Sequence, residues 1–277
     1  MTDIHRRLVA VVLVLGVCIA NASAGPEADL WPRWEAHDPQ SSQTLDHEPW
    51  NEFLAEYLVT DDPSGVNLVR YGEVTERDRG ALDAYVAFLE SVAVSDLNRD
   101  VQFAYWINLY NSYTVKLILD NYPVDSIRDI NISPGLFNRG PWDAEVVTVE
   151  GVDLTLNDIE HRIVRPIWEQ DPRIHYVVNC ASIGCPNLLP TALTGATLET
   201  TLSEAARDYI NHPRGVSIDG NRMTLSSIYD WYIEDFGDSV EGIIDHLLQY
   251  AESDLAEELR TFDGRVRYEY DWSLNEP

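Results

Sequence analysis

The chain has 277 residues, of which 45% are hydrophobic and 24% charged. This globular composition excludes collagen-like, low-complexity and wholly disordered chains. The 47 acidic residues outnumber the 19 basic ones, and the formal net charge of −28 argues against nucleic acid or an anionic membrane as a partner. Lys116 is the only lysine. Two explanations for this charge balance stay open: a surface adapted to high salt, or an acidic exported protein from a GC-rich genome.

The first 24 residues have the pattern of a secretory signal peptide. A positively charged start precedes 13 small and apolar residues at positions 8–20, fewer than the ~20 that span a bilayer. Residues 22–24 (ASA) then give the small-x-small motif that a signal peptidase cleaves. Cys18 lies in a sequence similar to a lipoprotein box, but the valine before it disfavours lipid attachment. We therefore expect a periplasmic or extracellular protein without a membrane span.

Two regions are expected after the signal peptide. Residues 25–49 are rich in Pro, Asp, Gln and Ser, which predicts an extended leader. Residues 50–277 contain no internal repeat and no flexible linker, which predicts a single domain.

Hydrophobic periodicity predicts the elements of this domain. Helices are expected at 50–58, 78–92, 102–122, 198–211, 226–236, 239–251 and 254–261. Short strands are expected at 65–71, 174–179 and 266–272, with a hairpin at 146–154. Thr155 and Asp158 resemble a capping box for a helix that runs to Arg165 and ends at Pro166. Strands scattered between helices predict an α+β fold, helix-dominated, with a small sheet of short strands.

The helix expected at 102–122 is apolar nearly all round, which is typical of a central, buried helix. Asn108 and Asn111 share one of its faces. An unpaired buried amide costs about 1–3 kcal/mol, so both amides need hydrogen-bond partners. They can belong to a structural network, or they can orient a catalytic group and line a pocket.

A second candidate is the segment 156–161, LNDIEH. Its helical period places Glu160 and His161 at the edge of a buried stripe. A nearby carboxylate raises the pKa of a histidine and can hold a general base. However, adjacent helical residues point about 100° apart, so Glu160 can instead pair with Arg162 or Arg165. His161 can equally be structural.

The third candidate is the segment 174–186, IHYVVNCASIGCP. As a strand it would place His175, Val177 and Asn179 on one face, before a loop of small residues that holds Cys180 and Cys185. Functional groups are common where a rigid strand gives way to a loop.

Four interpretations of the two cysteines stay open. In an oxidising compartment, Cys180 and Cys185 can form a disulfide. Cys180 can be a thiolate nucleophile, with His161 or His175 as the base. A Cys/His metal site is the third, although the four-residue gap is loose for zinc and no tetrahedral ligand set is evident. The fourth is a pair of inert buried thiols.

Four ordered segments resemble the bacterial and plant family known only as domain of unknown function 547. They are YWINLYNSYTVKLILDNYP, LNDIEHRIVRP, RIHYVVNCASIGCPNL and YDWSLN, and the resemblance runs from about Trp50 to Asn275. It implies a single helix-rich domain and supplies no activity. On the family's hallmark segments it places Trp106, Asn108, Asn111, Glu160, His161, His175, Cys180 and Cys185.

We expect an exported thiol-type hydrolase or acyl transferase that acts on an amide, ester or thioester of a small or peptide-like substrate. No cofactor is expected. The expected catalytic residues are Cys180, His161, His175 and Glu160, and the expected binding residues are Asn108, Asn111, Trp106, Asn179 and Ser182. The alternatives are a non-catalytic exported binding or structural module held by a Cys180–Cys185 disulfide, and a metal-dependent hydrolase.

Overall fold

The computed structural model describes residues 25–135, 140–169 and 171–277. The expected signal peptide and Cys18 lie outside these residues. The fold is α+β and helix-dominated, as predicted, but the short strands of the described residues form three small sheets instead of one. In the described part of the chain, no helix has the length and apolar character needed to cross a membrane.

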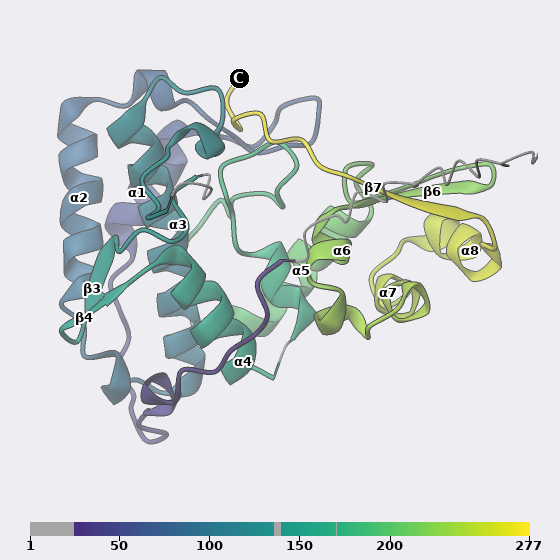
Figure 1. Ribbon diagram of the computed structural model, residues 1–277. Coiled ribbons are helices and arrows are strands. Elements are labelled where there is room, and N and C mark those ends of the chain that lie inside the picture. Colours follow the sequence, from purple (N-terminus) through teal and green to yellow (C-terminus); the bar gives the residue numbers. More distant parts are fainter. Residues whose placement is uncertain (1–24, 136–139, 170) are drawn as a thin grey trace, which may run out of the picture.

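The helices of the first half pack around one long central helix (Figure 1). This helix, α3 (Arg99–Asn121), is buried along almost its whole length, as its all-round apolar sequence predicts. Asn98 caps its first turn by accepting a hydrogen bond from the Val101 N–H at 3.0 Å. Around it lie α1 (Glu48–Tyr57), α2 (Glu76–Glu90), the pair β1 (Leu58–Val59) and β2 (Leu68–Val69), and the expected hairpin of β3 (Val147–Val149) and β4 (Val152–Leu154).

The second half builds a three-stranded sheet with helices around it (Figure 1). The strand order is β5-β6-β7, with β5 antiparallel and β7 parallel to β6. We did not predict the β5–β6 hairpin. The sequence contains a turn signal there, because Gly220 lies at the turn, and in the structure this glycine has a left-handed φ of +61°. The elements are α4 (Arg165–Ile167), α5 (Leu198–Ile210), β5 (Val216–Asp219), β6 (Arg222–Ser226), α6 (Ile228–Trp231), α7 (Val240–Leu247), α8 (Ser253–Thr261) and β7 (Arg265–Glu269).

Two predictions of local structure are wrong. The expected strand at 174–179 is instead a 3-10 helix, Pro172–Tyr176, whose first turn Asp171 caps by accepting from the Arg173 N–H at 2.9 Å. The helix after Thr155 does begin with the expected cap, because Thr155 and Asp158 hydrogen-bond to each other. However, it is wound as a π-helix over Asp158–Val164 and continues into α4 through Pro166. π-helical turns often occur at functional sites.

Residues 25–49 lie along the folded chain. Trp34 is buried and packs edge-to-face on Trp106, with ring centroids 5.2 Å apart. The Asp29 N–H donates to the His161 carbonyl at 3.0 Å, and the Trp31 N–H donates to the Arg162 carbonyl at 2.9 Å. The leader therefore runs beside the π-helix.

The buried apolar side chains form two clusters. One surrounds α3, and the other lies among α5, α7 and the three-stranded sheet. Val178 belongs to the first cluster and Ile228 to the second, yet both line the same cavity. The candidate site therefore lies where the two clusters meet.

Candidate functional site

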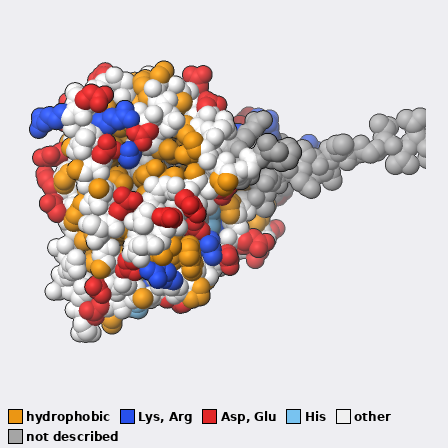
Figure 2. Space-filling view, turned by 60° about the vertical axis from the view of Figure 1, so that its left-hand side comes forward, with side chains coloured by type: hydrophobic (Ala, Val, Ile, Leu, Met, Phe, Trp, Pro, Cys, Tyr) orange, Lys and Arg blue, Asp and Glu red, His pale blue; other side chains and the backbone are white. Residues whose placement is uncertain are grey.

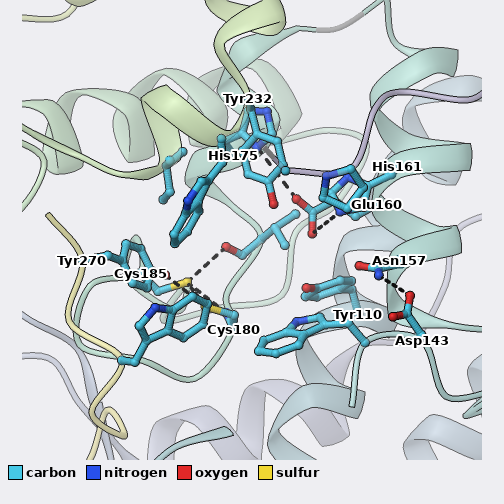
Figure 3. Close-up of a pocket in the computed structure, with 17 residues that line it drawn as sticks. Tyr110, Asp143, Asn157, Glu160, His161, His175, Cys180, Cys185, Tyr232 and Tyr270 are labelled. Carbon is cyan, nitrogen blue, oxygen red and sulfur yellow. Dashed lines mark hydrogen bonds and ion pairs between the residues drawn. The ribbon is translucent and has the colours of Figure 1, made fainter. Parts of the chain in front are cut away.

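A cavity of about 370 Å³ brings together the catalytic residues expected from the sequence. Glu160, His161, His175 and Cys180 all line it, although they come from three different segments (Figure 3). Six of the remaining lining residues are aromatic. The other lining residues are Gly25, Pro26, Tyr110, Trp142, Asp143, Asn157, Val178, Cys185, Ile228, Trp231, Tyr232, Tyr270 and Trp272.

The loop that carries the cysteines is held by amide side chains. Asn111 Nδ2 donates to the Val177 carbonyl at 2.8 Å, and its Oδ1 accepts from the Asn179 N–H at 2.9 Å. Asn179 in turn donates from Nδ2 to the Pro186 carbonyl at 2.8 Å and accepts at Oδ1 from the Ala181 N–H at 2.9 Å. Both amides thus satisfy backbone groups that a strand would have paired.

Four of the expected binding residues do not line the cavity: Asn108, Asn111, Asn179 and Trp106. Asn108 bonds both polar groups of Leu193, from Nδ2 to its carbonyl at 2.7 Å and at Oδ1 from its N–H at 3.0 Å. Trp106 is buried in the core of the first half. The interpretation of the asparagines as a structural network is the one that fits.

The backbone of the cysteine loop packs closely against the segment that follows β7. Ala181 has a left-handed φ of +57°, which costs an L-residue about 1–2 kcal/mol. The Gly184 N–H donates to the Asp271 carbonyl at 2.8 Å, and a Cβ at Gly184 would lie 2.7 Å from the Asp271 N. Only glycine permits this approach, and it brings Tyr270 to Cys180.

The Cys180 and Cys185 thiols are both free, with their Sγ atoms 2.9 Å apart, so the disulfide, one of the four open interpretations, is not formed. Cys185 is buried, whereas Cys180 is partly exposed. The hydroxyls of Tyr270 and Ser182 lie 3.1 and 3.2 Å from Cys180 Sγ. Ser182 is therefore placed beside the thiol, although it does not line the cavity.

These surroundings shift the pKa values of the two thiols in opposite directions. The hydrogen bond from Cys185 lowers the pKa of Cys180 and, together with those from Ser182 and Tyr270, outweighs the opposing effect of burial. Burial raises the pKa of Cys185 well above its ordinary range. Of the two thiols, Cys180 is therefore the one that ionises more readily, and a hydrogen bond from Cys185 favours its thiolate form.

The contacts of His161 orient it to donate a hydrogen bond from Nε2. Its Nδ1 lies 3.1 Å from Arg165 Nη1, and because arginine can only donate, the ring proton is on Nε2. Burial lowers the pKa of His161 to about 4, and the nearby Arg165 acts in the same direction. Glu160 does raise the pKa of His161, as expected, but burial has the larger effect and the net shift is downward.

His175 is held by Asp235, a residue that the sequence analysis did not identify. His175 Nε2 donates to Asp235 Oδ2 at 2.6 Å, and Arg165 Nε donates to the same oxygen at 2.6 Å. Burial raises the pKa of Asp235, but the hydrogen bonds from His175 and Arg165 outweigh it, so the net shift is downward and the group is a carboxylate. The Tyr232 ring stacks on His175, with centroids 4.3 Å apart, and fixes the plane of the imidazole.

Glu160 lies between the two imidazoles. Its Oε1 is 3.8 Å from His175 Nδ1, and its Oε2 is 3.9 Å from His161 Nε2. The Glu160 side chain is 8% exposed, and both of these distances are longer than a hydrogen bond. His175 Nδ1 and Glu160 Oε1 are thus close to each other in the cavity wall without a direct hydrogen bond.

The thiol and the imidazoles face each other across the cavity and do not touch. Figure 3 shows both cysteines beside Tyr270, apart from the group of Glu160, His161 and His175. The hydrogen-bond partners of Cys180 Sγ in the described chain are Ser182, Cys185 and Tyr270, and neither histidine is among them.

Within residues 25–135, 140–169 and 171–277, no three His, Cys, Asp or Glu side chains are grouped as metal ligands would be.

Three contributors to the site were missed: Asp235, Tyr232 and Tyr270. Asp235 lies three residues after Tyr232, which puts an acid on the otherwise apolar face of its segment. An acidic residue at an apolar helical position, together with the arginine in the buried run IVR (163–165), was the signal that could have found this ion pair.

The comparisons with known proteins give one match. Residues 94–210 match a family model whose description is "Protein of unknown function, DUF547". The matched residues include Glu160, His161, His175 and both described cysteines, and the predicted resemblance is confirmed over this range. Asp235 and Tyr270 lie beyond it. Neither a curated protein nor a solved structure matches the chain.

Proposed function

Starting from a chain whose residues 94–210 match the model of the DUF547 family, we propose that the protein is an exported thiol-dependent acyl-transfer enzyme. Its substrate is an amide, ester or thioester, and the acceptor is water or a second nucleophile. The observation that carries the proposal is the Cys180 thiol, whose pKa is lowered in the wall of the cavity that also holds His175 and Asp235.

The low pKa of Cys180 supports a nucleophilic role. A thiolate, and not a thiol, attacks a carbonyl carbon. Cys185, Ser182 and Tyr270 stabilise that thiolate without any help from a histidine. A base in contact with Cys180 is therefore unnecessary, which agrees with the separation of the thiol from both imidazoles.

The opposite wall supports an acid–base role for His175. Asp235 orients the imidazole through Nε2 and leaves Nδ1 toward Glu160. A carboxylate that fixes the tautomer of a histidine is the arrangement by which many hydrolases position their general base. His161, with its proton on Nε2, is suited to donate a hydrogen bond to substrate and not to accept a proton.

The proposed reaction has two steps. The Cys180 thiolate forms a C–S bond with the carbonyl carbon, and the bond to the leaving amine, alcohol or thiol breaks as that group takes a proton from the His175–Glu160 pair. Water then attacks the thioester and returns a proton to the pair, which releases the acid and regenerates the thiolate.

Trapping of the acyl-enzyme tests this proposal. The reduced protein is incubated with p-nitrophenyl acetate, and the modified residue is found by peptide mass spectrometry. We expect an acetyl group on Cys180, no acetylation in Cys180→Ser, and continued acetylation in the matched control Cys185→Ser. In His175→Gln the acetyl group should persist at least ten-fold longer, because the proton transfer that assists water is lost. Acetylation that is unchanged by Cys180→Ser would refute the proposal.

A further inference from the structure

We infer that the α-ammonium group of Gly25, freed by removal of residues 1–24, docks in the cavity wall as a positively charged group of the site. The inference concerns the same cavity and, for its effect on Cys180, rests on the proposed function. Its first support is that two unrelated observations meet at one residue. The ASA motif at 22–24 predicts cleavage before Gly25, and Gly25 and Pro26 line the cavity.

The contacts of Gly25 fit a chain end held in place. Its N–H donates to the Trp231 carbonyl at 3.0 Å. A Cβ on Gly25 would lie 2.7 Å from Tyr232 Cε1 and 2.9 Å from the Trp231 carbonyl oxygen. The backbone therefore approaches the cavity wall as closely as glycine allows. Tyr232 is the ring that stacks on His175, so Gly25 packs against the support of the proposed acid–base group.

The next residues are bound by the ion-pair network behind His175. The Pro26 carbonyl accepts from Arg165 Nη1 at 2.7 Å, and the Ala28 N–H donates to Glu234 Oε1 at 3.1 Å. Arg165 also holds Asp235 and His161. Residues 25–28 thus contact the groups that position both histidines, and these contacts anchor the chain end at the cavity.

The docked α-ammonium group acts through its positive charge. None of the described residues that line the cavity is Lys or Arg, whereas Glu160, Asp143 and the Cys180 thiol, whose pKa is lowered, are acidic groups of its wall. After cleavage, one proton of the new ammonium keeps the bond to Trp231, and two further protons become available beside the cavity. A positive charge there favours the Cys180 thiolate and the oxyanion that forms when it attacks a carbonyl.

The first experiment identifies the N-terminus and its environment. The full chain is expressed in an exporting bacterial host, and the N-terminal residue of the processed protein is sequenced. Because Lys116 is the only lysine, the variant Lys116→Arg has the α-amine as its single primary amine. We expect Gly25 at the N-terminus and acetylation by acetic anhydride at least ten-fold slower in native than in urea-unfolded protein. A chain that begins at Ser23, or an equal rate in both states, would overturn the inference.

The second experiment measures the effect on the thiol. Two proteins are compared that differ by one residue, one beginning at Gly25 and one retaining Ala24. We expect iodoacetamide to alkylate Cys180 at pH 7 at least three-fold faster in the Gly25 protein, and expect the advantage to decline as the α-amine deprotonates near pH 8. Equal rates and pH profiles would overturn the charge role. If Cys180 reacts in neither protein while the amine is protected, the acyl-transfer proposal fails and the docked N-terminus stands.

Discussion

Replacement of Asp235 by Asn isolates the contribution of the ion pair behind the cavity. The Asp235 side chain is 1% exposed and accepts hydrogen bonds from His175 Nε2 and from Nε and Nη2 of Arg165. An Asn side chain has only one acceptor oxygen, so its NH₂ group must face one of these donors. Arg165, also 1% exposed, then loses the partner that compensates its charge most directly.

The magnitude follows from burial. Removal of one partner from a buried ion pair lowers the free energy of unfolding by about 3–5 kcal/mol, because the remaining charge stays uncompensated. The matched control is Glu234→Gln, which also removes an ion pair with Arg165. Since Glu234 is 35% exposed, we expect a loss below about 1 kcal/mol.

Urea denaturation at pH 7 compares the two variants. The pKa of Asp235 is lowered in the folded state, so its stabilising effect is complete above the unfolded pKa of about 3.9 and is lost as pH falls through the folded value. The gap between wild type and Asp235→Asn should therefore narrow below about pH 4. Equal losses for the two variants, or a gap that widens in acid, would show that this account of the ion pair is wrong.

Three further predictions concern the rest of the chain. Burial lowers the pKa of His246 to about 4, so the free energy of unfolding should rise by about 3 kcal/mol from pH 4 to pH 6.5, where only the unfolded state takes up the proton. His246→Asn should flatten that part of the urea-unfolding profile by the same amount. Asn111→Ala should cost about 2–4 kcal/mol in the same assay, because the Val177 carbonyl and Asn179 N–H lose their partner, whereas the control Asn121→Ala, which removes one partly buried bond, should cost under about 1 kcal/mol. Acidic side chains are spread over the face in Figure 2, and with a net charge of −28 the melting temperature should rise with NaCl as self-repulsion is screened; a flat or falling Tm would favour the explanation without salt adaptation.

Local signals in the sequence predicted much of the fold. The all-round apolar pattern of 102–122 predicted the buried helix α3, and Thr155 with Asp158 predicted the helix start that the structure contains. Such features depend on neighbouring residues, so periodicity and capping rules apply to them directly. The same locality explains the error at 174–179. Its alternating apolar residues suggested a strand, but Asn111, from another helix, bonds its backbone in place of a neighbouring strand.

The candidate site was predictable only in part. Glu160, His161, His175 and Cys180 were singled out as reactive residue types, and the structure brings them to one cavity. The role of each depends on distant partners. Arg165 makes His161 a donor, and Asp235, 60 residues after His175 in the chain, makes that histidine the candidate acid–base group. Such pairings form only in the folded chain, so a single sequence does not reveal them.

Alkylation of the reduced native protein tests the central claim, that Cys180 is a reactive thiolate at the cavity. Iodoacetamide is added at a series of pH values, and the modified cysteine is identified by peptide mass spectrometry. The lowered pKa of Cys180 and the raised pKa of Cys185 predict modification of Cys180 alone, with a midpoint below the ~8.5 of an ordinary thiol. Modification of neither cysteine until the protein is unfolded, or of Cys185 first, would contradict it.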